Sequence, residues 1–182
     1  MALRFAIIIA LEDSQGSGYE IAKWFDGGLG YFWHASHQQI YLELKKMTAD
    51  GLVTFEEVQQ EGKPAKKIYS TTEAGFAALD HWLATPARQA PLKDALLMRI
   101  YAGSRISPTV LLAEVQRHQQ QNRELLETFE NIDRCFQPVK AKPIKYQYGY
   151  LTLRNGIIYL QGWLQWSEEV CAFLQDQIDD NP

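Results

Sequence analysis

The C-terminal part of the sequence carries an apolar repeat that only a long helix buried on two sides can satisfy. From Tyr146 to Ile178, apolar residues recur in steps of four and three, and Ser167 is the one polar member of the row. A second apolar row, from Tyr159 to Phe173, follows about 100° round the same helix. Because two adjacent apolar rows must bury two faces, this helix needs two partners.

The first partner can come from the same chain. The order Ser107-Pro108 is typical of a helix start, and the row from Leu111 to Phe136 keeps the same alternating spacing. His118 and Asn122 are its only polar members, and one such residue in a seam often fixes the register. We therefore expect the two long helices to pack together in the manner of a coiled coil.

The second partner must come from another molecule, and a two-fold dimer is the simplest arrangement. A single-chain helical bundle is the alternative that the pattern leaves open. The residues that we expect at the subunit interface are Leu153, Ile157, Leu160, Trp163, Leu164, Trp166 and Leu174.

The first half of the chain begins with three predicted helices. The apolar stretch 3–11 indicates a helix buried against others. Ser17 and Glu20 have the spacing of a capping box at the start of a second helix. We expect this helix to bury Tyr19, either Ile21 or Ala22, and Phe25. Ser36 and Gln39 repeat this spacing at the start of a third helix.

The periodicity then changes to that of a hairpin. Asp50-Gly51 is typical of a helix stop, and the segments 52–55 and 67–71 are strand-like, with Gly and Pro in the polar stretch between them. Thr72 can cap a fourth helix. Three helices, a hairpin and a helix in this order predict a winged helix-turn-helix, although a generic α+β domain shows the same order.

A break rich in Pro and Ala at 85–91 divides the chain into two predicted domains. We expect a winged-helix domain over 1–86 and a helical dimerisation domain over 87–182, whose first helix begins at Pro91. The fold class is therefore mainly α (α+β). The first domain contains 7 Lys and Arg against 11 Asp and Glu, so any nonspecific affinity for a polyanion should be modest.

Several classes of protein are disfavoured by the composition and spacing. Cys135 and Cys171 lie far apart, which indicates free thiols that behave as small buried apolar residues in a reducing compartment. The apolar stretch near the N-terminus is much shorter than the roughly 20 residues of a membrane span. We therefore expect a cytoplasmic protein that does not contact membranes.

Catalytic motifs are also missing from the sequence. His34 and His37 are three apart and do not form a metalloprotease pair, and there is no nucleophile elbow, phosphate loop or dinucleotide fingerprint. We expect a protein that is not an enzyme and that uses no metal or cofactor.

The order of these residues resembles the PadR family of bacterial transcriptional regulators, and the C-terminal half resembles its virulence-activator branch. One departure is His37-Gln38, where many members have Pro-Gly after the capping Ser. The segments that carry the resemblance are Gly18-Tyr19-Glu20-Ile21, Trp33, Ile40-Tyr41, Gly51-Leu52-Val53, Gly62-Lys63-Pro64, Lys67-Ile68-Tyr69, Leu151-Thr152-Leu153-Arg154-Asn155-Gly156 and Trp163-Leu164-Gln165-Trp166.

The resemblance implies a recognition helix that starts at Ser36 and a wing that carries lysines. A recognition helix places its N-terminal side chains in the major groove, where Gln can pair with adenine, and wing lysines can hold phosphates. The alternative without DNA binding is that Ser36 simply starts a solvated helix and that the lysines lie in a solvated, charged turn. The predicted DNA-contacting residues are Ser36, His37, Gln38, Gln39, Tyr41, Lys45, Lys63, Lys66 and Lys67.

The function that follows is a homodimeric, sequence-specific regulator of transcription whose half-sites on double-stranded DNA lie about one helical turn apart. Two alternatives remain. One is a helical adaptor that binds a protein partner. The other is an effector-sensing repressor, because PadR relatives commonly sense aromatic compounds between subunits. The large flat side chains that could line such a site are Trp82, Tyr159, Trp163 and Trp166.

Overall fold

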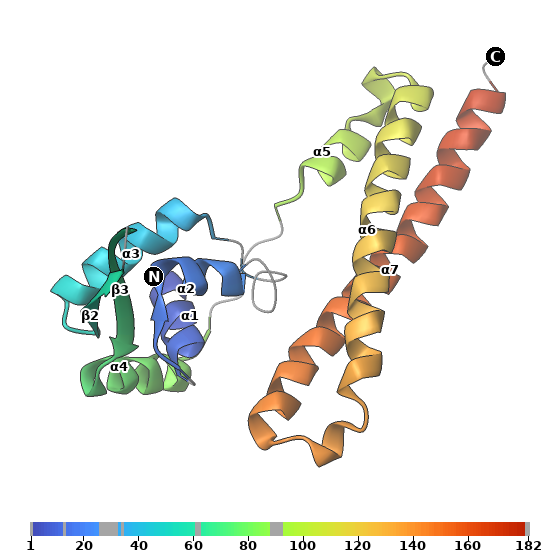
Figure 1. Cartoon of the computed structure of the whole chain (residues 1–182). Helices are drawn as coiled ribbons and strands as arrows, with labels where there is room; N and C mark the ends of the chain where they lie inside the picture. Colours follow the sequence, from blue (N-terminus) through green and yellow to red (C-terminus); the bar gives the residue numbers. More distant parts are fainter. Residues whose placement is uncertain are drawn as a thin grey trace. The chain divides into compact units, whose positions relative to one another are not determined.

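The computed structural model describes residues 2–12, 14–25, 33, 35–60, 63–87 and 93–180. The chain divides into two compact units, 1–89 and 90–182, so the division falls at residue 89 where the sequence places it at residue 86. Figure 1 shows the helices and strands of both units. Within the described ranges, none of the helices is long and apolar enough to cross a membrane.

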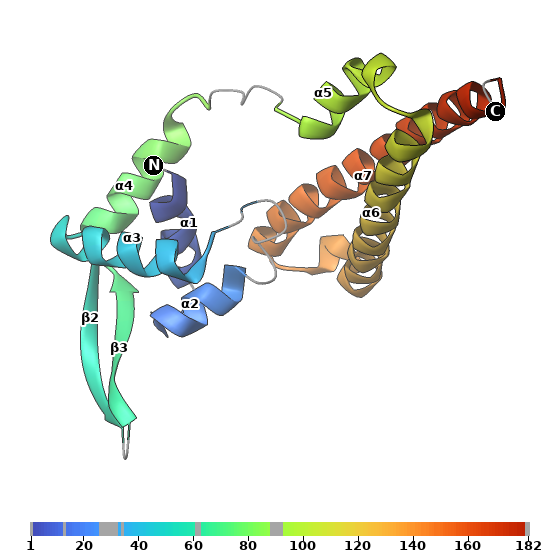
Figure 2. The same ribbon diagram turned by 90° about the horizontal axis from the view of Figure 1, so that it is seen from above.

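The first unit is a winged helix-turn-helix with a three-stranded antiparallel sheet of order β1-β3-β2. The strands β2 and β3 run side by side and extend beyond the helices as a wing (Figure 2). Its elements are α1 (Ala2–Leu11), β1 (Gly16–Ser17), α2 (Gly18–Phe25), α3 (His37–Ala49), β2 (Val53–Gln60), β3 (Lys63–Thr71) and α4 (Glu73–Ala84).

The hairpin is confirmed, but the sheet has longer strands and one more strand than the sequence predicts. Both long strands extend beyond the predicted segments, and β1 was not predicted at all. The outer part of the wing is solvated on both faces, so its polar residues pair through the backbone without an apolar alternation to reveal them. The strand β1 is only two residues long and pairs Gly16 with Tyr69, which leaves no periodic signal.

The core of this unit lies between α1, α2, α3 and α4. The side chains of Ile7 and Ile8 are fully buried, and the buried face of α3 consists of Ile40, Leu44 and Met47. The expectation that Tyr19 is buried is wrong, because this side chain is 63% exposed. The buried face of α2 instead contains Ile21, Ala22 and Phe25.

The predicted caps are confirmed by hydrogen bonds. The Ser36 and Gln39 capping box is complete at α3, and the Thr72 hydroxyl accepts a hydrogen bond from the Gly75 N–H at 3.0 Å. Gly51 follows α3 with φ of +73°, the left-handed conformation that its position after a helix predicts.

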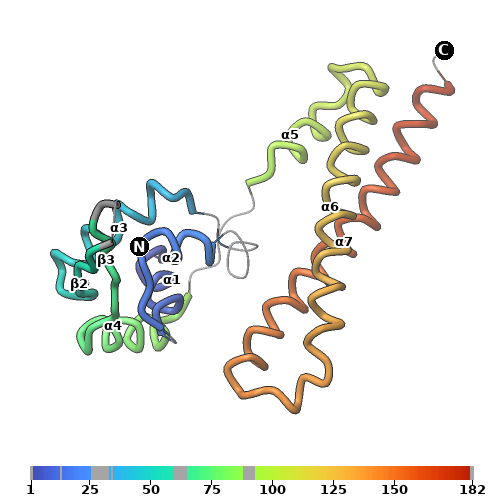
Figure 3. The backbone as a smooth tube through the Cα atoms, in the orientation of Figure 1, coloured from blue at the N-terminus to red at the C-terminus, as the bar shows by residue number. Residues whose placement is uncertain are grey.

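The second unit is a helical hairpin with a short helix against one end. The long helices α6 and α7 run antiparallel along most of their length (Figure 3). Its elements are α5 (Ala95–Tyr101), η2 (Gly103–Arg105), α6 (Pro108–Phe136), η3 (Val139–Ala141) and α7 (Ile144–Asp179). Pro91 lies outside the described residues, and the N-cap of α5 is Asp94, whose carboxylate accepts a hydrogen bond from the Leu96 N–H at 2.7 Å.

The first apolar row of α7 is covered by the chain itself. Phe129 of α6 packs with Ile157 and Leu160, while Leu174 packs in a second cluster with Leu111. Gly156 allows this close approach, because an added Cβ would lie 2.6 Å from the Phe129 ring. Assigning Ile157, Leu160 and Leu174 to the subunit interface is therefore corrected, because all three are at most 6% exposed within a single chain.

The buried polar residue of α7 is Ser167, as predicted, but its partner in α6 is not one of the two polar residues predicted for the seam. Gln119 donates a hydrogen bond to the Ser167 hydroxyl at 2.9 Å, and both side chains are buried. His118, predicted to lie in the seam, sits at its edge beside Glu114 and Trp163. The buried polar residue of α6 is therefore Gln119, one position after the predicted His118.

The close contact between α4 and Leu52, the residue before β2, predicts a strong effect of a glycine substitution. A Cβ at Gly75 would lie 2.2 Å from the Leu52 carbonyl oxygen, so Gly75→Ala should destabilise the first unit by about 1–3 kcal/mol. Chemical denaturation followed by circular dichroism measures this loss. Gly16→Ala is the matched control, because its Cβ would meet the nearest atom at 3.7 Å and cost little.

The buried amide in the hairpin predicts non-additive substitutions. Ser167→Ala removes the acceptor of Gln119 and should cost about 1–3 kcal/mol, because the amide is then buried without a partner. Adding Gln119→Leu to that variant should restore most of the lost stability, because the unpaired amide is then removed. Equal stability of Ser167→Ala and the unaltered protein in a denaturation series would contradict this account.

Candidate nucleic-acid interface

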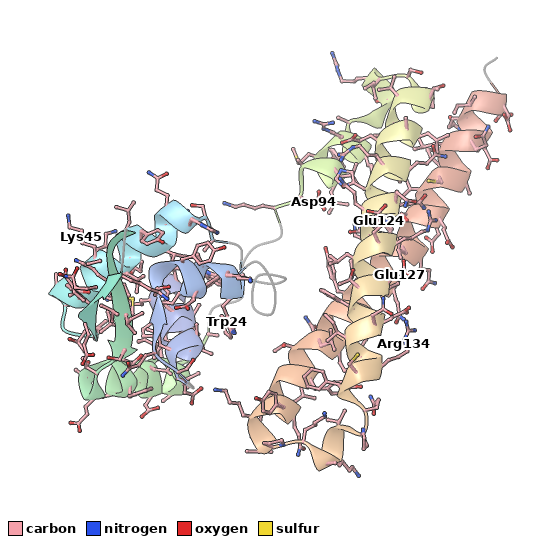
Figure 4. The ribbon with its side chains drawn as sticks, in the orientation of Figure 1. Trp24, Lys45, Asp94, Glu124, Glu127 and Arg134 are labelled. Atoms are coloured by element: carbon pink, nitrogen blue, oxygen red, sulfur yellow. The ribbon has the colours of Figure 1, made fainter. Side chains whose placement is uncertain are left out.

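Helix α3 has an exposed polar face opposite its buried one. Gln38, Tyr41 and Lys45 recur in steps of three and four, and all three are exposed. Figure 4 shows Lys45 projecting away from the body of α3. Because the buried face of α3 is fixed against the core, this row has a defined direction, as a surface that reads another molecule requires.

The capping box limits which residues at the start of α3 can read bases. The Gln39 N–H donates to the Ser36 hydroxyl at 3.3 Å, and the Gln39 side-chain oxygen accepts from the Ser36 N–H at 2.9 Å. Both acceptor oxygens are therefore engaged by the backbone. Gln38 is exposed on the first turn beside them, and His37 is exposed as well.

Tyr41 connects α3 to the start of α2. A Cβ at Gly18 would lie 2.4 Å from the Tyr41 ring, so the first residue of α2 packs directly on this ring. The ring is still 49% exposed. Burial, together with the proximity of Tyr41, raises the pKa of Tyr69, so the two phenols lie close together near the base of the wing.

The wing lysines have carboxylate partners within the chain. The Lys66 Nζ lies 3.1 Å from Glu20 Oε1, and the Lys67 Nζ lies 3.7 Å from Glu57 Oε1. Lys67 also lies 4.0 Å above the centre of the Phe55 ring. The side chain of Lys63 lies outside the described residues. Lys66 and Lys67 are therefore held in place, and a phosphate must share them with these partners.

Glu20 is fixed more tightly than its role as a cap requires. Its Oε2 accepts hydrogen bonds from the N–H and the hydroxyl of Ser17, both at 2.8 Å, and its Oε1 accepts from Lys66. These contacts, led by the Ser17 backbone N–H, lower the pKa of Glu20 to about 2. The sequence identified Glu20 as a cap but showed nothing of its ion pair with Lys66.

One apolar residue of the exposed face was also missed. Leu42 lies between Tyr41 and Lys45 on α3 and is 53% exposed. An exposed leucine on a polar helix face is suited to contact a thymine methyl group. The sequence places it next to the apolar positions of the helix, so its exposure appears only when the buried face is known.

The outer face of α7 is the second exposed surface. Trp163 packs in the cluster around Leu174, and its ring meets that of Trp166 edge-on at 5.6 Å. Leu153 is packed against the cluster around Phe129, and Leu164 is half-buried. The large apolar side chains that remain more than half exposed on α7 are Ile144, Tyr146, Tyr148, Leu151, Ile158, Tyr159 and Phe173.

A cavity of about 570 Å³ lies at the turn of the hairpin, away from the aromatic row that the sequence suggested for an effector. Cys135 is exposed here, contrary to the expectation that it is buried, while burial raises the pKa of the half-buried Cys171. Among the described residues, no group of three or more His, Cys, Asp and Glu side chains could hold a metal ion. The cavity is lined by Asn131, Ile132, Cys135, Phe136, Lys142, Pro143 and Tyr146.

Both units match known families. Residues 7–81 match the transcriptional regulator PadR-like family, and residues 92–175 match the virulence activator alpha C-terminal family. The probable transcriptional regulator Rv1176c of Mycobacterium tuberculosis is 32% identical over 97% of this chain and 100% of its own length. The negative transcriptional regulator PadR of Bacillus subtilis is 30% identical, with coverage of 94% and 97%.

Solved structures show the same fold. Bacillus subtilis PadR in complex with operator DNA superimposes with a TM-score of 0.82 at 28% identity, covering 96% of this chain and 99% of that one. The virulence activator AphA of Vibrio cholerae gives 0.80 at 31% identity, with the same coverage. A further structure of Bacillus subtilis PadR, with a TM-score of 0.78, contains p-coumaric acid. The chain belongs to the PadR-like family of DNA-binding transcriptional regulators, which are not enzymes.

Proposed function

We propose that this protein is a homodimeric, sequence-specific regulator in which α3 enters the major groove and the wing contacts the DNA backbone. The observation that carries the proposal is the exposed row Gln38, Tyr41 and Lys45, held in one direction by the buried face of α3. The operator complex of Bacillus subtilis PadR supports it, because that relative has the same fold and binds DNA.

Each residue of the row has a chemistry suited to a different part of the duplex. The Gln38 amide can pair with an adenine edge, because it offers a donor and an acceptor together. Lys45 lies two turns further along α3 and can neutralise a phosphate, while the Tyr41 hydroxyl can donate to one. Base reading therefore falls to the start of α3, and Lys45 with the wing supplies affinity that does not depend on sequence.

The outer face of α7 supports pairing of two chains. Leu151, Ile158 and Phe173 are each about 60% exposed and lie on the side of α7 that faces away from α6. These three residues form a stripe of exposed apolar side chains, which is typical of an interface, and a two-fold contact buries the same stripe of both chains. Two copies of α3 then meet two half-sites, which compensates for the acidic net charge of each DNA-binding unit.

A small aromatic effector is the second candidate function. Bacillus subtilis PadR forms a complex with p-coumaric acid, and the cavity at the hairpin turn has a volume in the usual range for small ligands. The adaptor alternative predicts no DNA binding, so salt dependence of duplex affinity distinguishes it from the main proposal.

The α3 row predicts two different effects on DNA binding. Gln38→Ala should reduce discrimination between the operator and unrelated DNA by about 1–3 kcal/mol, because it removes a contact with a base. Lys45→Ala should weaken binding to both DNAs alike and reduce the slope of log K against log salt by about 1. Fluorescence anisotropy with operator fragments selected from genomic DNA measures both quantities.

Lys140→Ala is the matched control, because Lys140 is exposed in η3 of the second unit. It removes the same charge and should leave the salt slope unchanged. If Gln38→Ala and Lys45→Ala altered operator and unrelated DNA equally, the separation of base reading from phosphate contact would be refuted.

The stripe on α7 predicts a monomer after a single substitution. Ile158→Glu places a charge at the centre of the stripe without touching the contacts with α6, so the helical content should stay and the dimer should dissociate. Sedimentation equilibrium measures the mass. Gln161→Glu adds the same charge on an exposed position beside the stripe and should remain dimeric. A dimeric Ile158→Glu variant would overturn the assignment of this face.

A further inference from the structure

The ion pair between Glu20 and Lys66 lies where the DNA-binding elements of the first unit meet. The strand β1 pairs Ser17 with Ile68 of β3, which brings the start of α2 next to the residues that precede Ile68. Gly18, two residues before Glu20, packs on the ring of Tyr41 in α3. The pair therefore lies close to Tyr41, at the junction of α2, α3 and the base of the wing.

From this arrangement we propose that Glu20 limits DNA affinity by competing with a backbone phosphate for Lys66. The inference rests on the proposed function, and it adds a residue that opposes binding to those that favour it. Lysine side chains are common contacts for phosphate oxygens. Here the Lys66 ammonium is already engaged at 3.1 Å by a carboxylate.

Glu20 cannot easily move aside when a phosphate approaches. Its second oxygen is fixed by the N–H and the hydroxyl of Ser17, so rotation of the carboxylate would break the cap of α2. A phosphate that contacts Lys66 must then lie within a few ångström of a fixed negative charge. That repulsion offsets part of the attraction that Lys66 provides.

The competing role and a bracing role predict opposite results. If Glu20 competes, its neutralisation frees Lys66 for the phosphate, and binding becomes tighter and more salt-dependent. If Glu20 only braces the wing, its neutralisation leaves Lys66 mobile, and binding becomes weaker or does not change. Glu20→Gln separates the two roles, because glutamine keeps an oxygen that can accept the hydrogen bonds from Ser17.

We expect Glu20→Gln to bind a mixed-sequence duplex about two- to fivefold more tightly than the unaltered protein, the size of one exposed ion pair. The slope of log K against log salt should become steeper by up to about 1. Fluorescence anisotropy with the full-length protein at several salt concentrations measures both, and circular dichroism confirms that each variant is folded.

Three further variants complete the experiment. Glu73→Gln is the matched control, because it removes the same charge from the exposed first turn of α4. It should raise the affinity for DNA by a smaller factor than Glu20→Gln does. Ser17→Ala weakens the cap but keeps the charge of Glu20, which isolates the effect of the cap. In a Lys66→Met background, Glu20→Gln should give no gain, because the cation that it frees is gone.

The possible outcomes are distinct. Tighter binding by Glu20→Gln that disappears without Lys66 supports the proposal. Equal or weaker binding, or a gain that persists in the Lys66→Met background, overturns it while leaving the proposed function intact. If the unaltered protein bound no duplex at low salt, the proposed function would fail, and this inference would fail with it.

Discussion

The burial of one face of α3 against α1 is the interaction on which the DNA-binding unit depends. Ile40, Leu44 and Met47 are fully buried, so the helix cannot rotate about its axis without exposing them. Arg4 of α1 adds an ion pair with Glu43 of α3 at 3.1 Å, on the border of that face. The direction of every exposed side chain of α3 is therefore set by residues of the buried core.

The features predicted correctly from the sequence are those that one element can encode alone. The capping boxes at Ser17 and Ser36 are local hydrogen-bond patterns, and Gly51 marks a helix end by its own backbone conformation. The repeat of apolar residues along α7 is also a local pattern. Such signals depend on neighbours within about one helical turn, so tertiary structure does not obscure them.

The features that were missed depend on contacts between distant segments. The strand β1 exists because β3 passes beside it, and the partner of Glu20 is 46 residues away in sequence. Tyr19 has the large aromatic side chain of a typical core residue, but other residues of α2 already occupy the buried face. Pattern reasoning shows that a face is apolar, and only the fold shows which apolar residues have room to be buried.

The same limit explains the reassignment on α7. Two adjacent apolar rows predict two buried faces, but nothing in the spacing says which row meets α6 and which meets another chain. The packing of Phe129 against Gly156 decides this, because a glycine is needed where the ring lies closest. Ile157 and Leu160 flank that contact and are buried by it. The face centred on Leu151 and Ile158, which belong to neither predicted row, is left exposed as a direct geometric consequence.

The charges of the first unit are arranged so that its attraction for DNA in general is weak. Its sequence is acidic overall, and Lys66 and Lys67 of the wing are each paired with a carboxylate, so these two lysines attract DNA less strongly than unpaired lysines would. A regulator benefits from weak nonspecific binding, because specificity depends on the ratio of operator affinity to the affinity for all other sites. Under the proposed mode of binding, restrained cations reduce the nonspecific affinity without altering the base contacts proposed for α3. In the proposed dimer, pairing of two chains raises operator affinity more than nonspecific affinity, because only the operator presents both half-sites in the correct register.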